Sequence, residues 1–347
     1  MTTEDAVPSG ALAGYLAREH PDLSGPFAVE RLGEGQSCLT FMVRGEEGWR
    51  AVLRRPPRGD LPPSAFDVTR EFRVMSALRE HGAAVPVPRT LSLCADPEVL
   101  GAPFYLMDPV DGHVVRTELP KELSSTEERA RMGHELSRTL VALHEVDPVA
   151  AGLETFGKPD GYLARQLRRM GQLWELARFR EIPEIEAVGA WLGENVPVAQ
   201  RASIVHGDYK LDNVIFAPEA PARLIAVVDW EMSTLGDPLA DLGWLLYFWF
   251  DPGDERFGLS VATVTDQEGF PRRRDLLERY AAETGADVSS ILWYVALAGW
   301  KIAIIMEGSY RRFLGGVTDH PQFTMLEEGV KVLARRSALA MKGDFGL

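Results

Sequence analysis

Residues 206–213 read His206-Gly207-Asp208-Tyr209-Lys210-Leu211-Asp212-Asn213, and residues 227–231 read Val227-Val228-Asp229-Trp230-Glu231. Each segment follows an apolar, strand-like stretch. Asp208 and Asn213 are five positions apart (213 − 208), so one loop can direct the first toward a hydroxyl group and the second toward a metal ion. Phosphoryl transfer requires such an aspartate, metal ligands and a cationic phosphate clamp rather than covalent chemistry by the protein. The two segments therefore predict a phosphoryl-transfer centre, with Asn213 and Asp229 as Mg²⁺ ligands.

A structural alternative exists for each segment taken alone. The first could be a turn with a capping aspartate, and the second a buried strand that ends in a polar residue. A motif is supported by its structural context. Both segments occur in the expected order, each after an apolar stretch, and this context favours the catalytic interpretation.

Length and composition predict an ordinary globular protein with two lobes. The chain has 347 residues, which exceeds the usual size of a single hydrophobic core. Hydrophobic residues make up 46% and charged residues 25%, as in typical folded proteins. The net charge of −14 argues against a nucleic-acid partner, which would require a basic face. It permits a cationic substrate, but a solvated acidic surface is the favoured interpretation.

The cysteines and the apolar segments indicate a cytoplasmic protein without a membrane partner. Cys38 and Cys94 are too few for a disulfide framework and lack metal-ligand spacing. The first five residues lack the basic and apolar regions of a secretion signal. The most apolar stretch, 288–306, is interrupted by polar side chains that include Lys301, which favours a buried helix.

Periodicity along the chain predicts an α+β fold. Alternation around glycine-rich turns predicts paired strands in 27–43 and 49–53, and an apolar run predicts a buried strand at 104–107. Ser64 and Asp67 indicate the start of a helix. Beyond residue 110, helical periodicity dominates. We expect a small nucleotide-binding lobe at 1–108, with an antiparallel sheet and a helix, and a larger, mainly helical lobe at 109–347 with the catalytic loop and the acceptor site.

With these motifs in place, the chain resembles the aminoglycoside phosphotransferase family of kinase-like enzymes, from about Val29 to about Arg336. Segments 52–57 (Val-Leu-Arg-Arg-Pro-Pro), 70–74 (Arg-Glu-Phe-Arg-Val) and 229–238 (Asp-Trp-Glu-Met-Ser-Thr-Leu-Gly-Asp-Pro) are similar to one branch. That branch also occurs as the amino-terminal kinase domain of certain acyl-CoA dehydrogenase family proteins. The resemblance implies a two-lobed protein-kinase-like fold and Mg²⁺-dependent transfer of the γ-phosphoryl group of ATP or GTP to a hydroxyl group.

The resemblance also implies roles for the motif residues. Asp208 would be the catalytic base or the carboxylate that orients the acceptor, and Asn213 and Asp229 would bind Mg²⁺. Lys210 would lie near the transferred phosphate, where a positive charge stabilises the transition state; a solvated surface lysine is the alternative. Asp241 would anchor the catalytic loop through its backbone.

In the small lobe, the resemblance implies a phosphate-binding turn. Gly33 and Gly35 would let the backbone approach the nucleotide, and Gln36 and Ser37 would offer further donors. Cys38 stands where protein kinases have a third glycine. Phosphate contact would therefore depend on Ser37 and on backbone N–H groups.

The lysine that clamps the phosphates in kinases is missing, because the first lysine of the chain is Lys121. Arg54 or Arg55 would take this role. Strand alternation places Arg54 on the face of Val52, where the kinase pattern has an adenine contact, and this favours Arg54 with Glu71 as its ion-pair partner. Guanidinium offers a bidentate fork in place of a point charge. Two ordinary surface arginines are the alternative.

The purine and acceptor sites are less specified. Met107, Asp108 and Val110 would offer backbone groups to the purine without distinguishing ATP from GTP. Aromatic residues at 244–250 and 293–300 are more typical of a core than of a pocket. If some line a pocket, with Glu231 facing it, an acyl-like or ring substrate fits better than a polycationic aminoglycoside.

Two functions follow as hypotheses. The first is a small-molecule kinase whose acceptor is a hydroxyacyl thioester or similar metabolite, or an aminoglycoside. The second is a nucleotide-binding module with weak or no catalysis, for which the missing lysine is the argument. Intact Asp208, Asn213 and Asp229 favour the enzyme.

Overall fold

The structure is a computed structural model that describes residues 3–23, 25–33, 38–57, 67–258, 261–318 and 321–347. The chain forms two compact units. Unit 1 comprises Met1–Asp111 and Ala226–Ser233, and unit 2 comprises Gly112–Ile225 and Thr234–Leu347. The sequence placed the boundary at 108/109 and assigned 226–233 to the larger lobe. This short segment instead belongs to unit 1, so the chain returns to unit 1 after leaving it.

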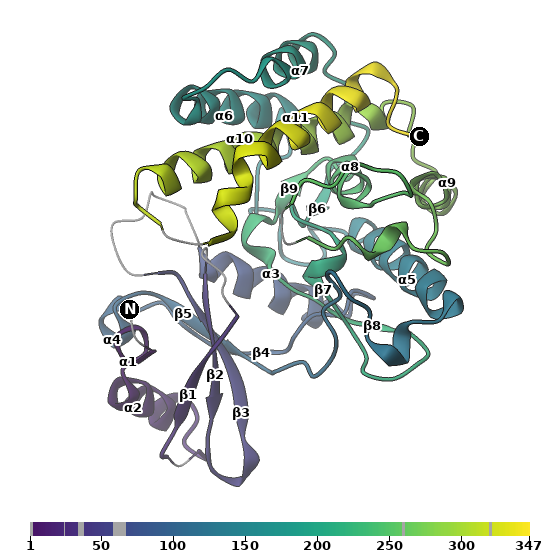
Figure 1. Cartoon of the computed structure of the whole chain (residues 1–347). Helices are drawn as coiled ribbons and strands as arrows, with labels where there is room; N and C mark the ends of the chain where they lie inside the picture. Colours follow the sequence, from purple (N-terminus) through teal and green to yellow (C-terminus); the bar gives the residue numbers. More distant parts are fainter. Residues whose placement is uncertain (1–2, 24, 34–37, 58–66, 259–260, 319–320) are drawn as a thin grey trace. The chain divides into compact units, whose positions relative to one another are not determined.

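Unit 1 is built on a five-stranded antiparallel sheet with the order β1-β2-β3-β5-β4 (Figure 1). Its strands are β1 (Ala28–Leu32), β2 (Leu39–Arg44), β3 (Arg50–Arg55), β4 (Thr90–Cys94) and β5 (Phe104–Met107). The helices are α1 (Thr3–Ala6), α2 (Ser9–Glu19), α3 (Val68–Glu80) and α4 (Pro97–Leu100), with short 3₁₀ turns η1 (Glu46–Gly48) and η4 (Trp230–Met232). Asp67 caps α3 by accepting from the backbone N–H of Thr69 at 3.0 Å, whereas Ser64 lies outside the described residues.

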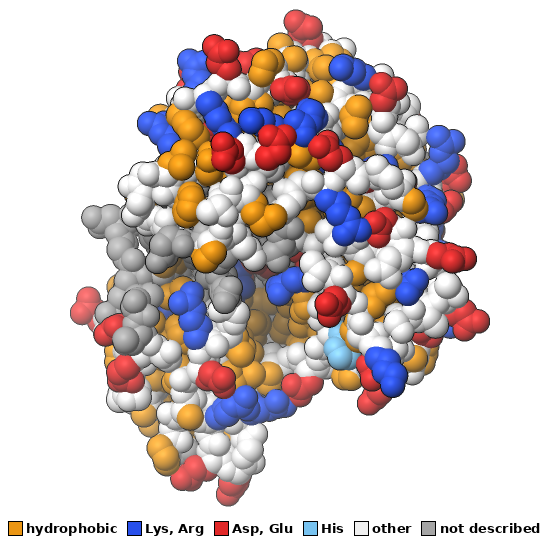
Figure 2. All heavy atoms as spheres, in the orientation of Figure 1, with side chains coloured by type: hydrophobic (Ala, Val, Ile, Leu, Met, Phe, Trp, Pro, Cys, Tyr) orange, Lys and Arg blue, Asp and Glu red, His pale blue; other side chains and the backbone are white. Residues whose placement is uncertain are grey.

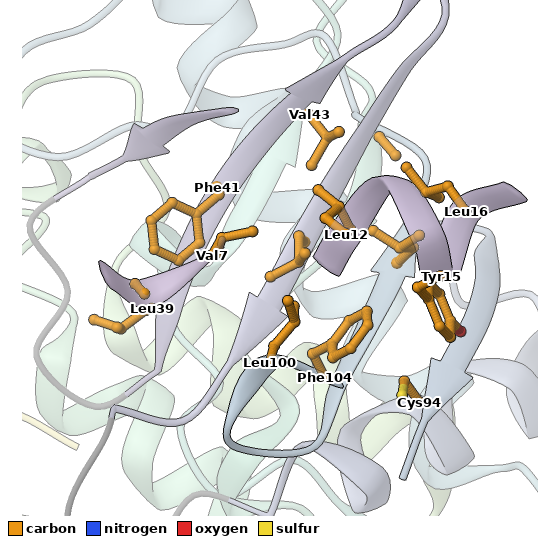
Figure 3. Close-up of a cluster of buried hydrophobic side chains, with 14 residues drawn as sticks. Val7, Leu12, Tyr15, Leu16, Leu39, Phe41, Val43, Cys94, Leu100 and Phe104 are labelled. Atoms are coloured by element: carbon orange, nitrogen blue, oxygen red, sulfur yellow. The ribbon is translucent and has the colours of Figure 1, made fainter. Parts of the chain in front are cut away.

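The two faces of β3 have different neighbours, because side chains alternate along a strand. Leu53 belongs to a buried cluster in which α2 covers one face of the sheet. Figure 3 shows Leu12, Tyr15 and Leu16 of α2 within this cluster. The Tyr15 ring packs edge-on against the Phe104 ring, with 4.9 Å between the ring centroids. Arg54, one residue after Leu53, therefore points to the opposite face, where α3 lies.

Unit 2 is mainly helical. Its helices are α5 (Thr126–His144), α6 (Tyr162–Ala177), α7 (Pro183–Glu194), α8 (Leu239–Phe248), α9 (Arg273–Thr284), α10 (Ile291–Leu314) and α11 (Leu326–Lys342). Shorter 3₁₀ turns are η2 (Lys121–Leu123), η3 (Leu211–Asn213), η5 (Val264–Asp266) and η6 (Pro321–Met325). Two small sheets pair β6 (Ser203–Val205) with β9 (Thr234–Gly236) and β7 (Val214–Phe216) with β8 (Leu224–Val227), and the last two residues of β8 already belong to unit 1. The expected α+β fold class is confirmed.

Helix α10 packs against α11, α8, α6 and α7, and Figure 1 shows α10 and α11 running side by side. Among the described residues it is the one helix whose length and apolar composition would suffice to cross a membrane, and 72% of its most apolar window is buried in the protein. This burial agrees with the predicted core helix. On the face in Figure 2, acidic and basic side chains are mixed, without an extended patch of one sign.

Candidate active site

The catalytic loop of unit 2 is anchored by Asp241. This carboxylate lies at the start of α8 and is fully buried. It accepts hydrogen bonds from the backbone N–H groups of His206 at 2.6 Å and of Gly207 at 2.8 Å. Gly207 has a φ of 86°, a conformation that favours glycine. The predicted anchoring role of Asp241 is confirmed.

Asp208 is held by three side-chain donors. Its Oδ2 accepts from Lys210 Nζ at 2.5 Å and from Asn213 Nδ2 at 2.7 Å. Its Oδ1 accepts from Trp244 Nε1 at 2.7 Å. The side chain is 18% exposed, so the carboxylate is fixed in orientation yet open to a reacting group. Asn213 uses its amide nitrogen in these contacts, and its amide oxygen accepts no hydrogen bond from the described residues.

In unit 1, Arg54 is surrounded by carboxylates. Its Nε lies 2.9 Å from Glu71, and a terminal nitrogen contacts Asp229 and lies 3.8 Å from Glu231. Glu71 is only 1% exposed, and it also accepts a hydrogen bond from Tyr105 Oη at 3.1 Å. Burial raises the pKa of Glu71, an effect that Arg54 opposes. The expected ion pair between strand β3 and helix α3 is therefore present.

Arg55 has a different environment. It is fully buried and donates hydrogen bonds to the backbone carbonyls of Ala6, of Leu100 at 2.8 Å and of Pro56 at 3.0 Å. These contacts tie the end of β3 to α1 and α4. Neither arginine is a solvated surface residue, so that alternative is wrong. The alternation along β3 assigns the carboxylate cluster to Arg54.

Asp229 adopts a backbone φ of 69°, in the left-handed region. Aspartate is among the few non-glycine residues that tolerate this conformation, which is often found at functional sites. Its side chain is 30% exposed. Asp229 belongs to unit 1 and Asn213 to unit 2, so a metal ion bound by both stays a prediction.

The predicted nucleotide turn is described only in part. Gly33 has a φ of 68°, and no atom of the described residues lies within 4 Å of the position that a Cβ would take, as a close-approach turn requires. Gly35, Gln36 and Ser37 lie outside the described residues. Cys38 is buried, and burial is the main cause that raises the pKa of its thiol. Its sulfur could join Glu71 and Glu231 around a metal ion, but a protonated thiol and the Arg54 guanidinium make this an ion-pair cluster instead.

The segment expected to contact the purine follows β5. Met107 ends this strand, pairing with Val52 of β3. The backbone N–H of Asp108 donates to the carbonyl of Arg89 at 2.8 Å, and its carboxylate accepts from Arg89 Nε at 2.7 Å. This N–H is therefore already used within unit 1, and purine contacts by Met107 and Val110 stay a prediction.

The aromatic residues of unit 2 are core, as the sequence favoured. Tyr247, Trp249, Trp293 and Trp300 are buried and donate their polar hydrogens to backbone carbonyls. Trp244 is the exception, because its indole contacts Asp208. Glu231, which the sequence associated with these aromatics, lies in unit 1 beside Arg54.

Three side chains of unit 2 lie in or near the catalytic loop, and the sequence alone did not indicate this. They are Trp244, Lys301 and Asp212. Trp244 follows the anchor Asp241 by three positions, and residues at this spacing share a helix face. Lys301 is the one charged residue in the apolar run 291–306. Burial raises the pKa of Asp212 to about 6, an effect that Lys210 opposes.

The anchored aspartate of unit 2 and the arginine–glutamate pair of unit 1 define a kinase-like phosphotransferase. The phosphotransferase enzyme family named APH matches residues 28–276, and the chain belongs to this family. The resemblance inferred from the motifs is thereby confirmed.

The relatives include the predicted branch. The chain is 35% identical over 315 residues to acyl-CoA dehydrogenase family member 10 of Mus musculus, covering 90% of the chain and 29% of the relative. It is 34% identical over 332 residues to acyl-CoA dehydrogenase family member 11 of Rattus norvegicus, and this match covers 93% of the chain and 42% of the relative. The chain thus spans less than half the length of the curated relatives it matches.

Solved structures share the fold. A protein of Ralstonia eutropha, described as a putative aminoglycoside phosphotransferase, is 33% identical with a TM-score of 0.79, and the match covers 96% of this chain and 98% of that one. The GDP complex of aminoglycoside 2'-phosphotransferase-IIIa has a TM-score of 0.62 at 16% identity, with 95% and 99% covered; at this identity it supports the fold alone. The predicted kinase-like fold is confirmed.

Proposed function

We propose that the protein is a Mg²⁺-dependent kinase that transfers the γ-phosphoryl group of ATP or GTP to the hydroxyl group of a small molecule. The observation that carries this proposal is the Asp208 carboxylate, held by Lys210 and Asn213 on a loop anchored by Asp241. The acceptor oxygen forms a bond to the γ-phosphorus, and the bond to the β–γ bridging oxygen breaks. The hydroxyl proton passes to Asp208, and the nucleoside diphosphate leaves.

The donor nucleotide would bind through unit 1. Arg54, oriented by Glu71, supplies a guanidinium for the phosphates, and Gly33 lets the backbone approach the nucleotide. The contacts predicted from the sequence for Gly35, Gln36 and Ser37 lie outside the described residues. Asn213 and Asp229 provide oxygen ligands, which Mg²⁺ prefers. A bound ion neutralises charge on the phosphates.

For the acceptor, we favour a hydroxylated acyl thioester or a related metabolite over an aminoglycoside. Relatives that carry the name acyl-CoA dehydrogenase are 35% and 34% identical. The chain is only 16% identical to the aminoglycoside phosphotransferase solved as a GDP and kanamycin complex. Sequence identity this low gives no support for a shared acceptor.

Nucleotide turnover tests the proposal. Purified protein is incubated with Mg²⁺ and ATP or GTP, and release of nucleoside diphosphate is measured with hydroxyacyl thioesters, aminoglycosides, sugars and amino alcohols. We expect acceptor-dependent release with the thioesters. Nucleotide binding without transfer to any acceptor would instead support the nucleotide-binding module.

A further inference from the structure

Lys301 lies near the middle of α10, among apolar side chains that pack against α8 and α6. It is only 7% exposed. Within the residues that the structure describes, its ammonium makes no hydrogen bond and no ion pair; it lies over the ring of Trp244, 5.2 Å from the centroid. A cation–π contact of this kind replaces only part of the lost hydration.

Two other buried cations of unit 2 form ion pairs with carboxylates. Arg273 lies 3.2 Å from the carboxylate of Asp251, and Arg336 lies 3.3 Å from that of Asp254. Buried charges are normally paired in this way, since an isolated one is costly. Lys301 has no such ion pair with a described residue, and buried ionisable groups with perturbed pKa values are frequent at functional sites.

The indole of Trp244 connects Lys301 to the catalytic loop. One part of the indole meets the Lys301 ammonium, and its Nε1 donates to Asp208 Oδ1 at 2.7 Å. Lys210 and Asn213 contact the other oxygen, Oδ2. In the proposed reaction these two side chains serve the phosphate and the metal ion. Trp244 therefore links Lys301 to the Oδ1 side of Asp208. This is the side that Lys210 and Asn213 leave for the acceptor.

We propose that Lys301 is an acceptor-binding residue whose ammonium binds a second, electron-rich oxygen of the acceptor, a thioester carbonyl or a carboxylate. This inference rests on the proposed kinase function. The acceptor would then be a hydroxyacyl compound, because it combines the hydroxyl group that receives phosphate with an oxygen that receives the lysine. Burial lowers the pKa of Lys301 to about 8, with Asp241 and Asp208 opposing and Arg169 adding to the effect.

The same charges disfavour a polycationic acceptor. Lys301 and Arg169 would repel the ammonium groups of an aminoglycoside in a partly desolvated site. A carbonyl or carboxylate oxygen would supply the partner that Lys301 lacks in the described part of the chain.

The test compares Lys301→Met with the wild type on matched acceptors. The probes are hydroxyhexanoyl-coenzyme A with the hydroxyl group at different chain positions, the corresponding free hydroxy acids, and the corresponding hexanols, which lack the second oxygen. Lys301→Arg keeps the charge, and Lys331→Met removes an exposed lysine as a matched control. KM and kcat are measured for acceptor and nucleotide separately, and circular dichroism checks folding.

We expect Lys301→Met to raise KM for the thioester or the acid about ten- to a hundredfold, the usual range for one charge-assisted hydrogen bond. KM for nucleotide and the weak reaction with the hexanols should not change, and Lys301→Arg should recover part of the loss. The thioester and acid arms distinguish a carbonyl from a carboxylate. An equal effect on the hexanols, or no effect on any acceptor, overturns the inference.

Failure of the proposed function gives a different pattern. If the wild type transfers phosphate to no probe, calorimetric binding of the thioesters and acids decides the inference alone. Binding that weakens at least tenfold in Lys301→Met supports it, whereas equal or absent binding overturns it.

Discussion

Replacing Lys301 by methionine should stabilise the protein at neutral pH while it impairs acceptor binding. Burial lowers the pKa of Lys301 from 10.5 to about 8. Each tenfold change in proton affinity corresponds to about 1.4 kcal/mol, so holding the charged ammonium in the fold costs about 3 kcal/mol. Methionine loses the contact with Trp244, worth about 2 kcal/mol when it is desolvated. A net gain of about 1 kcal/mol in the free energy of unfolding is expected at pH 7.

The pH dependence of this gain identifies its cause. Below about pH 8 both the folded and the unfolded wild type carry the charge, so the full cost is present. Between about pH 8 and 10.5 the unfolded chain binds more protons than the folded one, and the wild type gains stability as pH rises. The advantage of Lys301→Met should therefore shrink over this range.

Urea unfolding at pH 7 and at pH 9.5, followed by tryptophan fluorescence, measures the effect. Lys331→Met, which removes an exposed lysine, should show no comparable gain at either pH. A variant that is less stable than the wild type at pH 7, or a gain that does not change with pH, would refute the reasoning.

Four further substitutions test the proposed site and its surroundings. Asp208→Asn should lower turnover at least about a hundredfold, as expected for the loss of a positioned base, with nucleotide affinity nearly unchanged in a binding titration; comparable turnover contradicts the assignment. Arg54→Ala should weaken triphosphate binding about ten- to a hundredfold and nucleoside binding less, whereas Arg55→Ala should chiefly lower the unfolding midpoint because three backbone carbonyls lose their donor; the reverse pattern would exchange the two roles. Burial raises the pKa of Asp212 from 3.8 to about 6, so the wild type loses stability as pH rises through this range. Asp212→Asn should therefore be more stable than the wild type at pH 7 by about 1–3 kcal/mol, but not at pH 4. Urea unfolding midpoints at the two pH values measure the difference.

The sequence predicted the features that depend on local patterns. Alternation along β3 assigned Arg54 rather than Arg55 to the Glu71 side, because the period of a strand is fixed by its geometry. The spacing of Asp208 and Asn213 placed both on one loop, and their side chains are in contact. The anchoring role of Asp241 followed from the family motif.

Features that depend on packing between distant segments were not predictable in this way. The contact of Lys301 with Trp244 requires the packing of α10 against α8, which periodicity alone does not specify. The return of 226–233 to unit 1 depends in the same way on tertiary contacts, such as the hydrogen bond from Val227 N to Pro86 O at 2.8 Å. Hydrogen bonding of the Asp108 N–H to Arg89 is a third example.

The carboxylates around Arg54 have a consequence for the order in which ligands bind. Glu71, Asp229 and Glu231 together outweigh the single guanidinium, so a bare triphosphate would meet an excess of negative charge and would compete with Asp229 for Arg54. A divalent ion that accompanies the nucleotide reverses this balance and gives Asp229 another cation to bind. We therefore expect the protein to bind the nucleotide as its metal complex and to bind the metal-free triphosphate only weakly.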